Sequence, residues 1–106
     1  MGKDILLGID IGTTAVRAFA FNEEGTIVRE SKIEVSVEHP KPSWAEQDPE
    51  ELYSSTLKAV KAVTKYVGEH VRAIGFSGQM HGLCCFDKNG RPLTKLIPWV
   101  DVRAGE

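Results

Sequence analysis

The chain has no apolar run long enough to cross a membrane. Its most apolar run covers residues 5–11 and carries a carboxylate at Asp10, whereas a membrane-spanning helix needs about 20 predominantly apolar residues. The same run is too short for the apolar region of a signal peptide. We therefore expect a cytoplasmic protein with no membrane partner.

The chain also lacks any concentration of positive charge. It has 13 Lys and Arg residues against 15 Asp and Glu, for a net charge of −2, and no run of Lys or Arg. Proteins that bind nucleic acid or anionic lipid present clustered cations. The composition therefore argues against a nucleic-acid partner, and 106 residues leave room for one small domain.

Cysteine is scarce, because Cys84 and Cys85 are the only two and they are adjacent. Adjacent side chains on a strand point to opposite faces, which argues against a disulfide between them. There is no C-x-x-C pair and no second cluster of Cys and His, so the sequence offers no zinc site. We expect both to be reduced strand residues with a structural role.

The familiar nucleotide-binding loops are missing as well. No G-x-x-x-x-G-K-[ST] sequence is present, and no G-x-G-x-x-G opens a helix. Instead, the apolar strand at residues 5–11 carries Asp10, a small turn follows at residues 12–14, and Arg17 is a lone cation on the next strand. A carboxylate in an apolar strand is costly unless a metal ion or a strong hydrogen-bond network pairs with it.

The turn itself suits phosphate. Gly12, Thr13 and Thr14 have little side-chain bulk, so their backbone N–H groups can cradle phosphate oxygens. Asp10, this turn and Arg17 together predict a metal-binding carboxylate, a phosphate site and a phosphate-pairing cation close together in the sequence. A plain tight turn with no ligand is an alternative for so short a motif, because Asp and Gly often form one.

The pattern of apolar residues predicts a β-β-β-α-β order followed by a hairpin. Strands at residues 5–10, 16–21 and about 26–37 form an antiparallel meander with a glycine turn at residues 22–25. A helix then leads to a fourth strand, which should run parallel to a strand of the meander because a crossover connects them. The later elements are a strand at 71–76 and a hairpin with arms at 83–86 and 93–99.

The helix has clear signals at its start. Asp48 suits the N-cap, Pro49 the first helical position and Glu51 the partner position of a capping box. Gly68 is expected to stop the helix. This order of elements is the opening of the ribonuclease-H-like (actin-like ATPase) architecture, an α/β fold with a mixed sheet. The predicted helix face consists of Leu52, Thr56, Val60, Val63 and Val67.

A second polar segment, S-G-Q-M-H-G at residues 77–82, follows the fourth strand. Ligands favour the edge of an open α/β sheet where such strands end. Gln79 and His81 both donate and accept hydrogen bonds, and Met80 can pack against a carbon skeleton; polyol recognition needs these capacities. The alternative for a lone histidine is a loop residue whose hydrogen bonds are made within the protein. We interpret the other two histidines, His39 and His70, in this way.

In these segments, the chain resembles the FGGY-type carbohydrate kinases. Four stretches match in the family's order and span nearly the whole chain. They are G-I-D-I-G-T-T-A-V-R, W-A-E-Q-D-P-E-E-L-Y, S-G-Q-M-H-G and P-W-V-D-V-R. The resemblance implies the N-terminal portion of domain I of a two-domain kinase. G-Q-M-H-G is most similar to the segment of xylulokinases and is shared by sedoheptulokinases.

The resemblance also implies a role for each matched residue. Asp10 would hold a magnesium ion, the turn at residues 12–14 would bind phosphate oxygens of ATP, and Arg17 would neutralise charge on the transferring phosphoryl group. Two alternatives to sugar contacts stay open: packing of Trp99 between domains or in a core, and pairing of Asp101 and Arg103 only with each other. The implied sugar-binding residues are Gln79, Met80, His81, Trp99, Asp101 and Arg103.

The resemblance places the catalytic base, an aspartate, and most of the adenine pocket in the second half of the full protein, beyond residue 106. We therefore expect residues 1–106 to be a truncated piece of an ATP-dependent sugar kinase, with D-xylulose as the acceptor. Gluconokinase, ribulokinase and sedoheptulokinase are alternatives, as are an actin-like ATPase with no sugar substrate and a binding module. With its sheet unclosed, the piece should be inactive alone and form a homodimer or another self-associated state.

Overall fold

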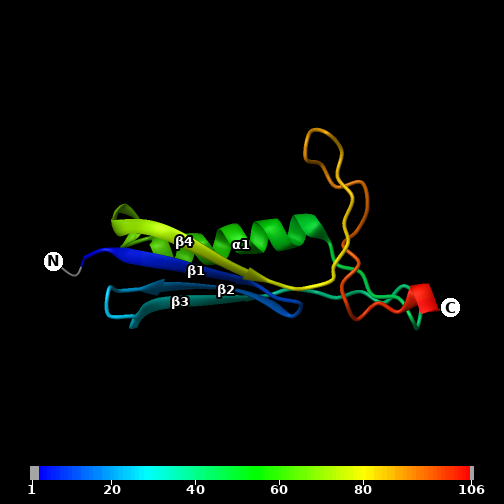
Figure 1. Ribbon diagram of the computed structural model, residues 1–106, viewed down its shortest axis with the longest axis horizontal. Coiled ribbons are helices and arrows are strands. Elements are labelled where there is room, and N and C mark those ends of the chain that lie inside the picture. Colours follow the sequence, from blue (N-terminus) through cyan, green and yellow to red (C-terminus); the bar gives the residue numbers. More distant parts are fainter. Residues whose placement is uncertain (1–2, 106) are drawn as a thin grey trace.

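The computed structural model describes residues 3–105; the first two residues and the last, which the predicted domain includes, lie outside this range. A four-stranded mixed sheet with the order β3-β2-β1-β4 forms the body of the molecule (Figure 1). β1 (Ile5–Ile11), β2 (Ala15–Phe21) and β3 (Ile27–Glu34) make the antiparallel meander. β4 (Val71–Gly78) runs parallel to β1, which confirms the predicted crossover.

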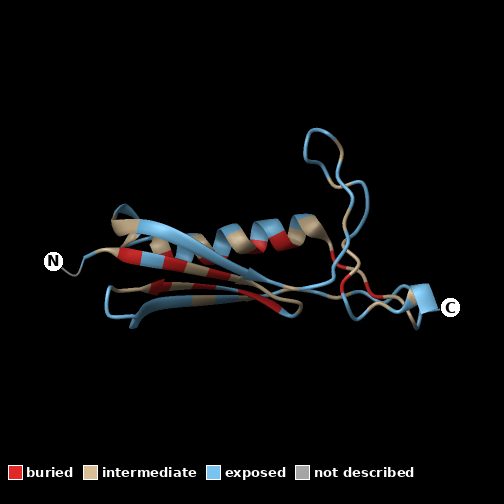
Figure 2. Cartoon of the chain, viewed as in Figure 1, coloured by how far each residue is buried: buried red, intermediate tan, exposed pale blue. Residues whose placement is uncertain are grey.

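One face of the sheet is covered by the helix α1 (Pro49–Thr64), and the core lies between them (Figure 2). Successive side chains of a strand point to opposite faces, so every second residue of β1 and β2 meets the helix. The residues between them, Asp10 included, stand on the other side, which we call the open face. The buried core consists of Ile5, Leu7, Ile9, Val16, Ala18, Ala20, Leu52, Ala59 and Val63.

The start of α1 is capped as predicted, but not by a capping box. The Asp48 carboxylate accepts a hydrogen bond from the Glu50 N–H at 2.9 Å. Glu51, the expected partner, accepts instead from the N–H of Ser36 at 2.7 Å. The segment after β3 brings this unpaired N–H to the helix, and a carboxylate satisfies it there. The predicted capping box is therefore wrong, and Glu51 fastens the helix to the end of the meander.

The helix ends earlier than predicted but turns the predicted face to the sheet, since Leu52 and Val63 are in the core and Val60 packs against it. It stops at Thr64, and Gly68 begins the short 3₁₀ helix η1 (Gly68–His70). Ser55 and Ala59 are buried beside the core, because small side chains allow a helix to lie close to a sheet. No helix in residues 3–105 is long and apolar enough to span a membrane.

The predicted hairpin after β4 is present only as single bridges. Leu83 pairs with Ile97 and Phe86 with Pro92, without forming strands, since proline has no N–H to continue a ladder. Cys84 and Cys85 therefore lie in a loop and not on a strand, although both are free thiols as expected. β3 likewise ends at Glu34 and not near residue 37, because the chain beyond it turns to pair Glu38 with Glu46.

Residues 79–105 extend from the end of the sheet as an arm, so the molecule measures 57 × 28 × 18 Å and its termini lie at opposite ends (Figure 1). The sheet itself is only partly covered. α1 packs mainly over β2 and β3, and an apolar groove of about 490 Å³ runs between α1 and β4. Phe76 borders this groove and is 70% exposed. The outer edges of β3 and β4 pair with no other strand in the described residues.

Candidate functional site

The open face carries a polar row near the end of β1. Asp10 is half-buried, and the strand registers place it opposite Arg17 of β2 and beside Ser77 of β4. Arg17 is paired in turn with Lys32 of β3. Residues opposite one another in a sheet share a face, so a carboxylate, a hydroxyl and two cations line up across all four strands. Sequence reasoning missed Ser77 and Lys32, because it did not supply the strand registers.

Open space lies beside the Asp10 carboxylate. Among residues 3–105, neither Asp10 nor Arg17 forms an ion pair within 4 Å. A hollow of about 450 Å³ opens next to Asp10, bordered by the rings of Phe19 and Phe21. Gly75 leaves this floor flat, since no atom lies within 4 Å of the place a Cβ would occupy. The carboxylate and the cation are thus both accessible to a charged ligand.

The glycine–threonine turn closes the end of this row. The Gly12 N–H donates to the Ala15 carbonyl at 2.9 Å, and a Cβ on Gly12 would stand 3.0 Å from that same oxygen. Only glycine fits here without moving the turn. The Thr14 carbonyl accepts from the Val35 N–H at 3.0 Å, and that of Thr13 from a side chain at 2.7 Å. With these carbonyls held by the protein, the turn is fixed in place at the end of the polar row.

The segment after β4 is tied directly to this turn. The Gln79 N–H donates to the Ile11 carbonyl at 3.2 Å, and Thr13 Oγ1 donates to Gln79 Oε1 at 3.4 Å. Met80 and His81 follow immediately and are exposed, Met80 to 70%. The structure therefore joins the predicted phosphate turn to Gln79, the residue directly before Met80 and His81, and the amide of Gln79 contacts the protein.

His81 has an unusual backbone conformation. Its φ of 62° lies in the left-handed region, which is uncommon for residues other than glycine, although histidine, asparagine and aspartate adopt it more often than the rest. Such positions are costly and cluster at binding and catalytic sites. The conformation turns the chain at the histidine, near the start of the arm. The sequence did not predict this backbone conformation.

Trp99 stands on the arm and is 61% exposed. It is therefore not packed in a core within the described part of the chain, and packing against another domain stays a prediction. Figure 1 shows the arm leading away from the sheet. A sugar contact by Trp99 stays a prediction.

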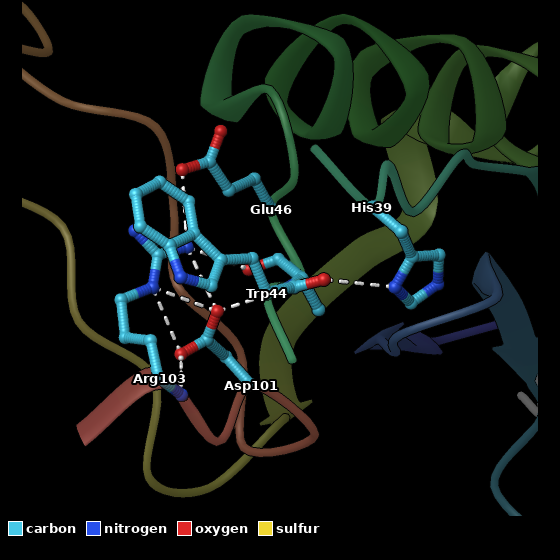
Figure 3. Close-up of polar contacts among 6 residues, drawn as sticks. His39, Trp44, Glu46, Asp101 and Arg103 are labelled. Carbon is cyan, nitrogen blue, oxygen red and sulfur yellow. Dashed lines mark hydrogen bonds and ion pairs between the residues drawn. The ribbon is translucent and has the colours of Figure 1, made fainter. Parts of the chain in front are cut away.

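Asp101 and Arg103 form a cluster with the segment at Trp44, Ala45 and Glu46 (Figure 3). The Arg103 guanidinium lies 3.8 Å from the centre of the Trp44 ring and 3.0 Å from the Glu46 carboxylate. Asp101 accepts from the Ala45 N–H at 2.6 Å and from Arg103 Nε at 2.8 Å. The two residues therefore do pair with each other, and they fasten the arm to the segment before α1.

This cluster stabilises the negative charge of the Asp101 carboxylate. Hydrogen bonds from Arg103 and from the Ala45 N–H lower the pKa of Asp101 to about 2, against the opposing effect of burial. Its side chain is only 3% exposed, so the carboxylate depends on these donors. Carboxylates that accept several hydrogen bonds stay ionised well below their ordinary range. Direct sugar contacts by Asp101 and Arg103 stay predictions.

The donor set on the open face fits magnesium better than zinc. Within residues 3–105, no three His, Cys, Asp or Glu side chains gather into a metal-binding group. Magnesium does not need such a group, because it binds through one or two carboxylates and completes its shell with water and substrate phosphates. Asp10 offers one carboxylate beside open space and next to the turn, so the residues present fit a magnesium–phosphate complex.

The meander, crossover helix and parallel strand, with an acidic residue beside a glycine–threonine turn, define the N-terminal part of a ribonuclease-H-like (actin-like) domain. The profile described as "FGGY family of carbohydrate kinases, N-terminal domain" matches residues 5–106. The chain belongs to the FGGY family of carbohydrate kinases. This membership confirms the resemblance seen in the four sequence segments.

Known relatives agree on the family and differ in substrate. A xylulose kinase of Staphylococcus epidermidis is 39% identical over 106 residues, covering 97% of this chain and 21% of that protein. A glycerol kinase of Aquifex aeolicus is 40% identical over 101 residues, covering 93% and 20%. The crystal structure of a xylulose kinase from Brucella ovis superposes with a TM-score of 0.87 at 34% identity, covering 94% and 22%. The chain thus spans about a fifth of the length of its relatives.

Proposed function

We propose that residues 1–106 are the first part of a sugar kinase that transfers the γ-phosphate of ATP to a hydroxyl of D-xylulose. The observation that carries the proposal is the contact between Thr13 and Gln79, because it holds the predicted phosphate turn against the segment that presents Met80 and His81. A kinase needs its phosphate site and its acceptor site side by side. A cytoplasmic location and the absence of nucleic-acid or membrane partners stay predictions from the composition.

Phosphoryl transfer requires positioning and charge stabilisation more than covalent chemistry by the protein. In the proposed site, the N–H groups of Thr13 and Thr14 and the hydroxyl of Thr14 hold phosphate oxygens, and Arg17 compensates charge on the phosphoryl group. Asp10 is placed to hold magnesium, which when bound neutralises phosphate charge. The sugar is oriented by His81 and Met80. The base that deprotonates the acceptor hydroxyl is proposed to lie beyond residue 106.

The acceptor is tested by ranking kcat/KM of the complete kinase over xylulose, ribulose, sedoheptulose, gluconate and glycerol. The proposal expects xylulose to rank first, because G-Q-M-H-G is the segment that faces the acceptor. A clear preference for gluconate or glycerol would reject the ketopentose assignment and keep the kinase. Failure to phosphorylate any of the five, with ATP hydrolysis unaffected by sugar, would favour the actin-like alternative.

His81→Ala should lower kcat/KM for the sugar by about 10- to 100-fold, the range expected when one or two hydrogen bonds to hydroxyls are lost. KM for ATP should change little, since the phosphate turn is untouched. His81→Asn is the matched control, because asparagine keeps a hydrogen-bonding side chain and tolerates the left-handed backbone; it should retain most of the activity. Equal losses toward sugar and ATP in His81→Ala would indicate a structural histidine.

We further propose that residues 1–106 expressed alone self-associate and are inactive. The apolar groove between α1 and β4 and the unpaired edge of β4 are surfaces that proteins usually cover. Light scattering should therefore show species larger than a monomer, and a coupled assay with ATP and xylulose should show no turnover. Phe76→Glu should reduce the association, whereas Leu93→Glu, at an equally exposed apolar residue on the arm, should not. A monomer that phosphorylates xylulose would contradict both claims.

A further inference from the structure

Gln47 is the largest fully buried side chain of the chain's described part, and it is polar. Only 1% of the residue is exposed. Its backbone pairs with Leu96 in both directions, at 2.9 and 2.8 Å, which joins the segment before α1 to the arm. Burying a primary amide is costly unless its donors and acceptor are satisfied. Its hydrogen-bond partners therefore show why a polar residue occupies this position.

The amide of Gln47 links the two halves of the proposed site. Its Nε2 donates to the Thr13 carbonyl at 2.7 Å and to the Ser36 carbonyl at 3.3 Å. Its Oε1 accepts from Gln79 Nε2 at 2.8 Å. Gln79 Oε1 accepts a hydrogen bond from the Thr13 hydroxyl, and Gln79 Nε2 lies 3.5 Å from the Gly12 carbonyl oxygen. Gln47, Gln79 and Thr13 thus form a closed set of hydrogen bonds. This set connects the turn at residues 12–14, which we call the phosphate turn, with the segment at residues 77–82, which we call the sugar segment.

These contacts differ from those of an ordinary buried amide. The side-chain partners of Gln47 come from three separate places in the sequence: the turn after β1, the segment after β3 and the segment after β4. No other side chain in residues 3–105 hydrogen-bonds to both Thr13 and Gln79. Because a shift of about 1 Å between reacting groups can cost 10²-fold in rate, a residue that sets the distance between turn and sugar segment affects the chemistry without touching a substrate.

We propose that Gln47 is a positioning residue that holds the phosphate turn in register with the sugar segment, so that the acceptor hydroxyl meets the γ-phosphate. The proposal rests on the kinase function proposed above. It assigns no substrate contact to Gln47. It also gives Gln79 a second task, since the amide that fixes the segment is bonded to Gln47 while the next two residues face the acceptor.

If Gln47 no longer holds the phosphate turn at the correct distance from the sugar segment, the products of the reaction should change. When the acceptor hydroxyl is displaced, water can attack the γ-phosphorus in its place. The oxygen of water then forms the new P–O bond, the bond to the bridging oxygen breaks, ADP leaves with that oxygen, and the proton of water goes to solvent. The products are ADP and inorganic phosphate. The ratio of ATP hydrolysed to sugar phosphorylated therefore reports on register, whereas simple loss of folded protein lowers both rates together.

The test compares Gln47→Leu with the wild type in the complete kinase, using xylulose and ATP. Leucine keeps most of the volume and removes every hydrogen bond of the amide. We expect kcat to fall by about 10- to 100-fold and the hydrolysis-to-transfer ratio to rise at least severalfold, with KM for each substrate nearly unchanged. Val63→Ala is the control: this buried helix residue lies away from the site, so it should lower Tm without changing the ratio.

A double-mutant cycle adds an independent readout. Gln47→Leu and Gln79→Leu should be strongly non-additive in kcat, because each removes the same hydrogen bond. If Gln47→Leu does not fold, Gln47→Asn decides by the same ratio, since its shorter amide cannot reach both partners. An unchanged ratio in a folded Gln47 variant, or additive effects, overturns the proposal. A wild type that phosphorylates no sugar would instead reject the kinase function, so the two failures are distinguishable.

Discussion

Asp10→Ala in the complete kinase should reduce sugar phosphorylation by about 10³-fold or more, the scale on which loss of a key electrostatic group acts in an active site. Asp10 is the carboxylate of the polar row, set beside Ser77 and opposite Arg17, and open space lies next to it. If it holds the magnesium of the nucleotide, the change removes the one carboxylate that the row contains within residues 3–105.

The fold should tolerate the same change. Asp10 forms no ion pair among residues 3–105, so its removal costs no such contact, and it relieves the burial of a charge near an apolar strand. Thermal unfolding of Asp10→Ala should therefore match the wild type or occur at a slightly higher temperature. Activity that falls together with Tm would point to a structural role for the carboxylate.

Asp4→Asn is a suitable control for the charge itself. Asp4 precedes the same strand and forms an ion pair with Arg72 at 3.0 Å, with both side chains half-exposed or more. Exposed ion pairs contribute little to stability, so this variant should keep full activity and nearly full stability. Near-normal phosphorylation by Asp10→Ala, with Asp4→Asn unchanged, would show that the metal assignment is wrong.

Asp101→Asn should give the second large effect, a loss of stability that depends on pH. At neutral pH the variant should unfold several degrees below the wild type, because asparagine cannot carry the charge that Arg103 and the Ala45 N–H stabilise. The arm should detach from the segment before α1 in the same step. Thermal unfolding measured from pH 7 to pH 2, with hydrogen exchange of the Ala45 amide, tests both claims.

The sign of the pH dependence follows from the direction of the shift. The pKa of Asp101 is lowered from 3.8 to about 2 in the folded chain, so its contribution is complete above the unfolded value and is lost as pH falls from about 4 toward 2. The difference in Tm between wild type and Asp101→Asn should therefore shrink over that range. A difference that stays constant down to pH 2 would contradict the role assigned to the ionised carboxylate.

Local sequence signals were sufficient for the elements with strong patterns. The strand at Ile5–Ile11, the strand at Ala15–Phe21 and the start of the helix at Pro49 follow from alternation, small turn residues and the Asp48 cap, all of which act over a few residues. The family assignment rested on longer motifs and is confirmed. These features were predictable because their causes lie close together in the chain.

Two errors have other origins. Glu51 could have formed a capping box, but its carboxylate accepts from the unpaired N–H of Ser36, a tertiary contact that the sequence alone did not reveal. The hairpin beyond β4 did not form strands, because Pro92 has no N–H to continue the ladder, and Cys84 and Cys85 therefore lie in a loop. The first error came from a distant part of the chain, and the second from a proline whose effect on strand pairing was overlooked.

The site was predicted as two separate motifs, and the connection between them was missed. Gln47 is part of the W-A-E-Q-D-P-E-E-L-Y stretch that led into the helix, yet nothing in its spacing pointed to Thr13 or Gln79. The one sequence feature that marks Gln47 is its place directly before the N-cap residue Asp48. Lys32 and Ser77 were missed because they enter the polar row only through the register of the sheet.

The parallel pairing of β1 with β4 also sets the order in which the chain can fold during synthesis. β1, β2 and β3 are connected by short turns, whereas the contact of Thr13 with Gln79 closes a separation of 66 positions. Nearby pairings form faster than distant ones, and the N-terminal part of a chain leaves the ribosome first. The meander can thus form while one edge of β1 is still bare, and the candidate site is completed only when β4 arrives.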